Sequence, residues 1–171
     1  MADEWEITDE ELDAWYDEWK ATDRAAAEYL ADRIPGVADD AGEDDARWLD
    51  AVAATIRAPD EPEDLDPADI ESLSAVSALQ HADWLGLTLG IVRRGPGAAV
   101  EPEEVLTDVN GLDDVEGEIE DPEGFVEVLT AALRDLTPRW QALGVLDPGG
   151  RLTERGVRGL PRALHRMWSA D

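Results

Sequence analysis

Residues 84–92 read Trp-Leu-Gly-Leu-Thr-Leu-Gly-Ile-Val, the longest predominantly apolar stretch of the sequence. This stretch is too short to cross a bilayer, because a membrane-spanning helix needs about 20 apolar residues. When these residues are placed on a helix, apolar side chains fall on nearly every side of it. The stretch therefore predicts a helix buried nearly all round, at the centre of the fold.

The residues on either side extend this helix. Asp66 and Pro67 are residue types that favour an N-cap and a first helical position, and Gly95-Pro96-Gly97 ends a helix. We therefore predict one long central helix from Asp66 to Arg94. Its first half has a single apolar face, made by Ile70, Leu73, Val76 and Leu79.

The N-terminal part predicts two amphipathic helices. Thr8 and Glu11 have the spacing of a capping box, which marks a helix start, and Pro35 ends this helix. Apolar residues recur at helical spacing along it, and we expect Trp15 and Trp19 to pack in the core. The second helix is indicated by apolar residues at matching intervals, namely Trp48, Leu49, Val52 and Ile56.

These elements predict a mainly α protein that forms one globular unit with three parts. Residues 1–57 are an N-terminal amphipathic helical pair. Residues 58–67 contain three prolines and five acidic residues, which indicates an acidic, Pro-rich linker. Residues 68–171 form the helical core and a C-terminal unit. A length of 171 residues is sufficient to bury such a core.

The C-terminal unit combines helices with a tight turn. We expect a helix to begin near Pro138 and to end at Gly144, where glycine can adopt the left-handed conformation. Residues 147–150, Asp-Pro-Gly-Gly, have the composition of a turn between two short extended segments. Thr153 can cap the next helix. The pattern predicts a helix, a short β-hairpin and a second helix.

Two phrases in this unit, Leu-Gly-Val-Leu at 143–146 and Leu-Thr-Glu-Arg-Gly at 152–156, resemble the end of a winged-helix domain of the MarR type. The resemblance implies a recognition helix that ends at the first phrase and a hairpin wing after it, here shortened to a four-residue turn. Winged helices serve either DNA or protein contacts. Residues 80–164 are also similar to proteins of unassigned function from high-GC actinobacteria.

The charge of the chain is strongly negative and unevenly distributed. It has 42 acidic and 14 basic side chains and a net charge of −28. Residues 134–171 hold seven arginines and four acidic residues, a net +3, which leaves −31 for residues 1–133. This acidity indicates salt adaptation or solubility, or else a basic partner, and it disfavours nucleic acids and anionic membranes as partners.

Arginines and tryptophans are the candidate interaction residues. Arg155, Arg158, Arg162 and Arg166 lie on one face of the last predicted helix. These four, with Arg139 and Arg151, are candidate contacts to phosphates or to a partner's acidic patch, and the acidic remainder of the chain favours pairing within the molecule. We expect Trp5 and Trp168, close to the ends of the chain, to be exposed anchors for a partner protein.

Catalytic signatures are absent from the sequence. It has no Cys, and its two histidines, His81 and His165, have no metal-ligand companion at helical spacing. We therefore expect no cofactor or metal and a non-enzymatic cytoplasmic protein, an adaptor or regulatory subunit that acts through protein contacts. Two alternatives stay open: a winged-helix DNA-binding regulator that uses the arginine face, and an enzyme with a carboxylate-held metal. A homodimer also stays open.

Overall fold

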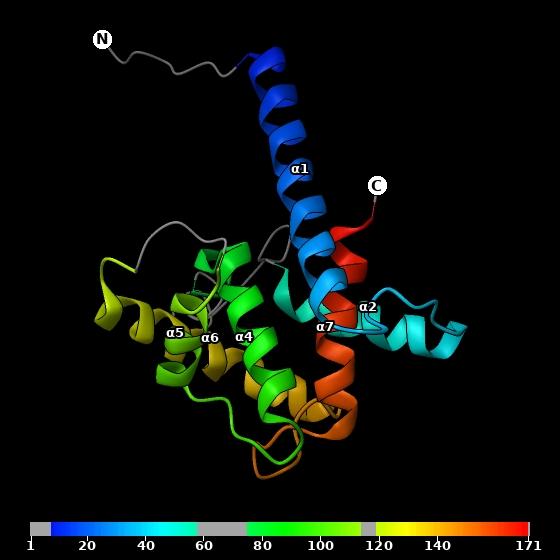
Figure 1. Ribbon diagram of the computed structural model, residues 1–171, viewed down its shortest axis with the longest axis vertical. Helices are drawn as coiled ribbons and strands as arrows, with labels where there is room; N and C mark the ends of the chain where they lie inside the picture. The colour runs from blue at the N-terminus through cyan, green and yellow to red at the C-terminus, as the bar shows by residue number, and fades with distance from the viewer. Residues whose placement is uncertain (1–7, 58–74, 114–118, 171) are drawn as a thin grey trace, which may run out of the picture.

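The computed structural model describes residues 8–57, 75–113 and 119–170, and these form a mainly helical protein, as the sequence predicts (Figure 1). The β-structure of the described residues consists of two isolated antiparallel bridges, which join Ala99 to Arg151 and Leu146 to Leu152. The predicted hairpin therefore does not extend into a sheet. The helices with both ends in the described ranges are α1 (Asp9–Arg33), α2 (Glu43–Ile56), α4 (His81–Arg94), α5 (Pro102–Asn110), α6 (Pro122–Ala142) and α7 (Glu154–Trp168).

Helix α4 contains the apolar stretch and lies in the middle of the molecule, packed against α1, α5 and α7. Its side chains from Trp84 to Leu87 and at Ile91 are buried. Gly86 and Gly90 allow α5 to approach closely, because a Cβ at Gly86 would lie 2.5 Å from Val109 and one at Gly90 would overlap the Asp108 carboxylate. The prediction of a central, buried helix is therefore confirmed for this segment.

The predicted continuous helix from Asp66 to Arg94 is wrong in its extent. Residues 75–78 are helical, but the chain is extended at Gln80, which is the N-cap of α4. The backbone N–H of Gln80 donates to Asp83 Oδ2 at 2.8 Å, so a polar cap starts a new helix here. Burial raises the pKa of the Asp83 carboxyl. The predicted helix start at Asp66 and the linker 58–67 lie outside the described residues.

Helix α6 corrects a second boundary. It runs unbroken through Pro138, where the sequence predicts a helix start. Proline removes one backbone hydrogen bond from a helix interior. The helix continues because Leu129, Ala132, Leu136 and Trp140 bury one face at helical spacing. The cost of the lost hydrogen bond is therefore offset by burial on both sides of Pro138.

The N-terminal helices complete the same core as the C-terminal ones. Helix α1 packs on α7 and α4 through Ala26, Ala27 and Leu30, and α2 packs on α7 and α6. The indole N–H of Trp140 donates to Thr55 Oγ1 at 2.9 Å, which joins α6 to α2. The Trp48 indole N–H donates to the carbonyl of Leu143 at 2.8 Å.

The left-handed glycine, the turn and the helix cap that the sequence predicts between α6 and α7 are present. Gly144 is left-handed, with φ of 72°, and Gly150 N–H donates to the Asp147 carbonyl at 2.9 Å. Thr153 caps α7 by accepting from Gly156 N–H at 2.9 Å. The segment after α4 joins this turn, because Leu152 N–H donates to the Ala98 carbonyl at 2.8 Å.

Of the helices in the described ranges, none is both long and apolar enough to cross a membrane.

Candidate functional site

The N-terminal half of α1 extends beyond the body of the protein and carries four exposed apolar side chains (Figure 1). Leu12, Trp15, Tyr16 and Trp19 are 47%, 60%, 56% and 51% exposed. Their spacing of i, i+3, i+4 and i+7 places them on one side of the helix. We call these four residues the α1 apolar face. The expectation that Trp15 and Trp19 pack in the core is therefore wrong.

The α1 apolar face continues into the core of the molecule. Farther along the same side of α1, Ala26, Ala27 and Leu30 are buried against the body. The change from bulky to small side chains marks the point where α1 enters the body, because small residues allow close helix packing. The sequence therefore changes in side-chain size at this point, although bulky apolar residues by themselves do not distinguish an uncovered stripe from a buried one.

A series of rings joins the exposed end of α1 to the buried end of α7. The ring centroids of Trp15 and Trp19 are 5.8 Å apart, those of Trp19 and His81 are 5.6 Å apart, and those of His81 and Trp168 are 5.2 Å apart. His81 Nε2 also lies 2.6 Å from Asp23 Oδ1. These contacts fix the base of the projecting half of α1 against α4 and α7.

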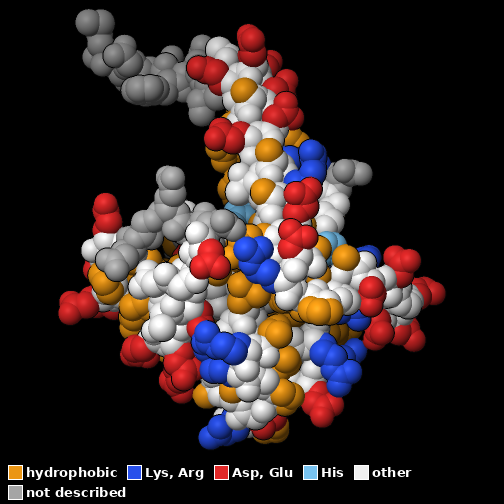
Figure 2. Space-filling model, in the orientation of Figure 1, with side chains coloured by type: hydrophobic (Ala, Val, Ile, Leu, Met, Phe, Trp, Pro, Cys, Tyr) orange, Lys and Arg blue, Asp and Glu red, His pale blue; other side chains and the backbone are white. Residues whose placement is uncertain are grey.

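Acidic side chains border the α1 apolar face, and Figure 2 shows acidic side chains along the projecting part of the helix. At 100° per residue, Asp9 and Asp13 fall on one border of the face and Glu11 and Glu18 on the other. All four are exposed. Lys20 is the one basic residue among positions 9–23, and its Nζ lies 5.4 Å from the centre of the Tyr16 ring. The site is therefore an apolar stripe bordered by negative charge.

Trp168 does not belong to an exposed surface. It is 5% exposed and packs beside His81, so the expectation of an exposed anchor at this position is wrong. Its place three residues from the end of the chain does not expose it, because α7 continues to Trp168 and carries the ring into the core. The other predicted anchor, Trp5, lies outside the described residues.

The predicted arginine face of α7 makes contacts within the chain. The guanidinium of Arg155 lies 4.0 Å from the centre of the Trp48 ring, and Arg162 donates to the Asp39 carbonyl at 3.1 Å. Arg166 Nε lies 2.7 Å from Asp50 Oδ1, and Arg158 pairs with Glu154 on its own helix at 3.1 Å. Pairing with an acidic side chain of residues 1–133, as expected, is therefore present for Arg166. Arg155 and Arg162 contact that part of the chain through a ring and a backbone carbonyl, and Arg158 pairs within α7.

The two other candidate arginines are also engaged locally. Arg139 pairs with Asp135 one turn earlier on α6 at 3.3 Å, and Arg151 donates to the Gly97 carbonyl at 2.9 Å. Arg151 therefore ties the turn before α7 to the segment after α4. The six candidate arginines are distributed over α6, the turn and α7, and each of them makes a contact within the chain.

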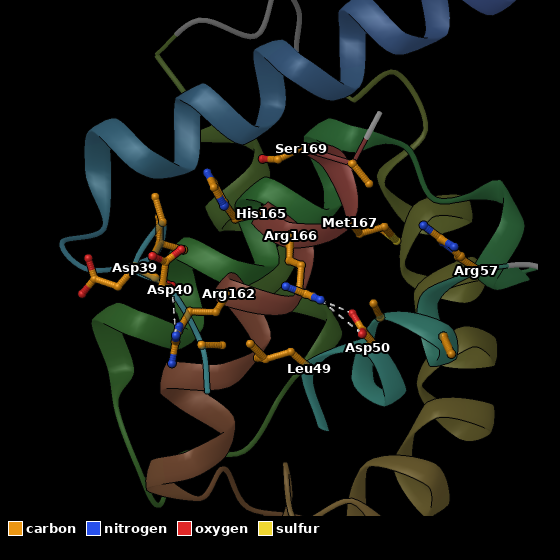
Figure 3. A pocket seen from close by; sticks show the side chains of 16 residues that line it. Asp39, Asp40, Leu49, Asp50, Arg57, Arg162, His165, Arg166, Met167 and Ser169 are labelled. Carbon is orange, nitrogen blue, oxygen red and sulfur yellow. Dashed lines mark hydrogen bonds and ion pairs between the residues drawn. The ribbon is translucent and has the colours of Figure 1, made fainter. Parts of the chain in front are cut away.

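A hollow of about 790 Å³ lies between α2, the loop before it and α7 (Figure 3). The hydrogen bond from Arg166 lowers the pKa of the Asp50 carboxyl, and burial lowers the pKa of His165. The charged lining residues balance each other, three basic against three acidic, so the hollow has no excess of positive charge for an anion. They are Asp39, Asp40, Asp50, Arg57, Arg162 and Arg166.

A buried cluster of charged residues joins two helices. The Asp108 carboxylate is buried and pairs with Arg93 and, at 2.8 Å, with Arg94 Nη1, which joins α5 to α4. Within the described ranges, no group of three or more His, Cys, Asp or Glu side chains is arranged to hold a metal ion.

The α1 apolar face is therefore the best candidate site, a surface for contact and not a pocket for chemistry. Comparison with known proteins adds no analogue, since no family model, curated protein or solved structure matches the chain.

Proposed function

We propose that the protein is a non-enzymatic adaptor or regulatory subunit that binds a partner protein through the α1 apolar face. The observation that carries this proposal is the exposure of Leu12, Trp15, Tyr16 and Trp19, each about half or more, on one side of a helix that extends from the body. Contiguous exposed apolar residues mark interaction surfaces, and Trp and Tyr are enriched where binding energy concentrates.

The size of the face limits the binding energy that its apolar area can provide. Each aromatic side chain buries about 150–250 Å² when fully covered, so the exposed halves of these residues offer roughly 400 Å². At about 25 cal/mol per Å², covering this area contributes roughly 10 kcal/mol. Association itself costs about 4–15 kcal/mol. The apolar area alone therefore supports weak binding, and a stable complex needs further complementarity at the borders of the face.

The proposal also includes a winged-helix-like C-terminal unit, and it gives this unit a structural role. Three features support it: α6 precedes a tight turn, a bridge joins Leu146 to Leu152, and the segment after α4 pairs with the same turn at Ala99 and Arg151. By the resemblance, α6 would be the recognition helix. Its first turns expose Glu123 and Glu127, which repel phosphates. These side chains favour a protein contact over DNA binding.

The test is recovery of a partner from native lysate with the full-length protein. We expect the wild-type protein to retain a stoichiometric partner and the double variant Trp15→Ala with Tyr16→Ala to lose it. The residues lie outside the core, so circular dichroism should give the same melting temperature for the variant. Val92→Ala is the control, because Val92 is an exposed apolar residue on α4, 36% exposed and away from the α1 apolar face.

Two results would contradict the proposal. In the first, the wild-type protein is recovered from lysate as a monomer without a stoichiometric partner. In the second, the Trp15→Ala and Tyr16→Ala substitutions leave partner recovery unchanged, which would place the contact elsewhere on the molecule.

A further inference from the structure

We infer that the occupant of the α1 apolar face is an amphipathic helix whose own apolar stripe is bordered by Lys and Arg side chains. This inference rests on the proposed function and adds the chemistry of the partner. A helix is the matching shape, because apolar residues at i, i+3, i+4 and i+7 are the pattern by which one helix packs along another. The face from Leu12 to Trp19 spans two helical turns, about 10 Å.

The borders of the face determine the charge of the partner. Asp13 and Glu18 lie on opposite borders, and each is exposed. A helix packed on the face would place its own border residues within a few ångströms of these carboxylates, well inside the Debye length of about 8–10 Å. Lysine or arginine at those positions forms ion pairs, whereas acidic residues there are repelled.

A second copy of this chain does not satisfy the charge requirement. Residues 9–20 of α1 contain six acidic side chains and one lysine. Pairing two such helices, in either direction, brings a net charge of about −5 against another of the same sign. Like charges at this separation destabilise the contact, and the limited apolar area cannot offset that repulsion easily.

The acidic segments of the same chain are disfavoured for the same reason. The sequence of residues 58–74 contains seven acidic side chains and no basic one, and residues 1–7 contain three acidic side chains and no basic one. Three arginines of α7 are engaged in contacts with Trp48, Asp39 and Asp50, and the fourth, Arg158, pairs with Glu154 on the same helix. A separate basic helix therefore complements the α1 apolar face better than any of these segments.

The experiment measures binding of synthetic helical peptides to the full-length protein by calorimetry at low salt. One peptide, about 20 residues long so that it can form a helix, has a leucine stripe bordered by Lys and Arg. A second has the same stripe bordered by Glu. A third has the basic composition in scrambled order, without a stripe. We expect the first peptide to bind and the other two to bind at least about tenfold more weakly.

Variants of α1 provide a control for net charge. Asp13→Lys with Glu18→Lys reverses both borders of the face, whereas Glu10→Lys with Asp17→Lys makes the same change of charge on the opposite side of the helix. We expect the border variant to bind the basic peptide about tenfold more weakly and the opposite-side variant to change the affinity by less than about threefold. The Trp15→Ala and Tyr16→Ala protein should not bind the basic peptide.

The outcomes separate this inference from the proposed function. If the Glu-bordered peptide binds as tightly as the basic one, or the two charge variants behave alike, the partner chemistry is wrong while the α1 apolar face remains the binding site. If the scrambled basic peptide binds as tightly as the basic peptide with a stripe, the attraction is unspecific and the inference is wrong.

If light scattering shows a dimer that dissociates in the variant with Trp15→Ala and Tyr16→Ala, a second copy is the occupant and the inference is wrong. If a partner recovered from lysate depends on these residues but lacks a basic amphipathic helix, only the inference fails.

Discussion

At the scale of single residues, the buried hydrogen bond between Trp140 and Thr55 has the clearest energetic consequence. The Thr55 hydroxyl accepts from the Trp140 indole N–H and donates to the Val52 carbonyl at 2.6 Å. Trp140 is fully buried, so water cannot replace a lost acceptor. Thr55→Val keeps the shape of the side chain and leaves the indole N–H unsatisfied. We expect the free energy of unfolding to fall by about 1–3 kcal/mol, measured by urea denaturation.

Thr130→Val is the matched control for this prediction. The Thr130 hydroxyl also donates to a carbonyl of its own helix, that of Val126, at 2.7 Å, but Thr130 is exposed and supports no buried donor. The control should change the free energy of unfolding by no more than about 0.5 kcal/mol. Equal effects of the two substitutions would show that the Trp140 hydrogen bond is not the source of the stabilisation.

At the scale of elements, the start of α1 is the boundary that the sequence predicts best. Thr8 Oγ1 accepts from Glu11 N–H at 3.2 Å, and Glu11 Oε2 accepts from Thr8 N–H at 2.9 Å. The backbone hydrogen bond from Thr8 lowers the pKa of Glu11 below its ordinary 4.5, and the Thr8 hydroxyl adds to this. A lowered pKa means that the stabilisation by this cap is present above pH 4.5 and is lost as the pH falls through the pKa of the folded state.

Thr8→Ala tests this capping box. The substitution removes the hydroxyl and keeps the backbone N–H of residue 8, so the pKa of Glu11 should rise only part of the way toward its ordinary value, as measured by an NMR titration of the side-chain carboxyl. Amide exchange in the first turn of α1 should accelerate about fivefold, as expected for a cap that contributes about 1 kcal/mol. Thr22→Ala is the control, because the Thr22 hydroxyl donates to the Glu18 carbonyl at 3.1 Å and contacts no carboxylate. Unchanged amide exchange in Thr8→Ala would contradict a stabilising cap, and an unchanged Glu11 titration would contradict the share that the Thr8 hydroxyl has in lowering the pKa.

The element boundaries that were predicted wrongly have identifiable causes. The predicted helix from Asp66 to Arg94 rests on apolar periodicity that continues across Gln80, although the Gln80 N–H is capped by Asp83. A Gln-x-x-Asp pair is a weaker sequence signal than the Thr8 and Glu11 pair, so it does not stand out. Pro138 has the residue type of a helix start, but the burial of Leu136 and Trp140 on one face continues α6 through it. A local polar cap decides the first case, and tertiary packing decides the second.

The candidate site shows a different limit of sequence-based prediction. Periodicity identifies the α1 apolar face as a stripe, but a stripe that packs in the core and a stripe that faces solvent have the same spacing. Which half of α1 is covered depends on where α7 and α4 lie, and this is a long-range property. Trp168 illustrates the converse, since it is buried although it lies near the end of α7, and its ring packs beside His81, a residue distant in the sequence.

At the scale of the whole molecule, repulsion within a chain of net charge −28 governs how stability responds to salt. Raising monovalent salt from about 0.1 to 1 M shortens the Debye length from about 10 to 3 Å, which screens this repulsion. The ion pairs that salt also weakens are mostly exposed, such as Arg166 with Asp50, and exposed pairs contribute about 0–1 kcal/mol each. The repulsion should therefore dominate, and the melting temperature should rise with salt.

The pH dependence of this salt effect distinguishes charge screening from a general effect of salt on apolar burial. Near pH 4.5, about half of the glutamates are protonated, so the repulsion to be screened is smaller. The same salt step should then raise the melting temperature by fewer degrees than at pH 7, measured by circular dichroism, with each 1 kcal/mol corresponding to about 2–4 °C at this chain length. A rise of equal size at both pH values would assign the effect to apolar burial, because burial does not depend on the charge of the carboxylates. A fall in melting temperature at pH 7 would mean that the ion pairs outweigh the repulsion.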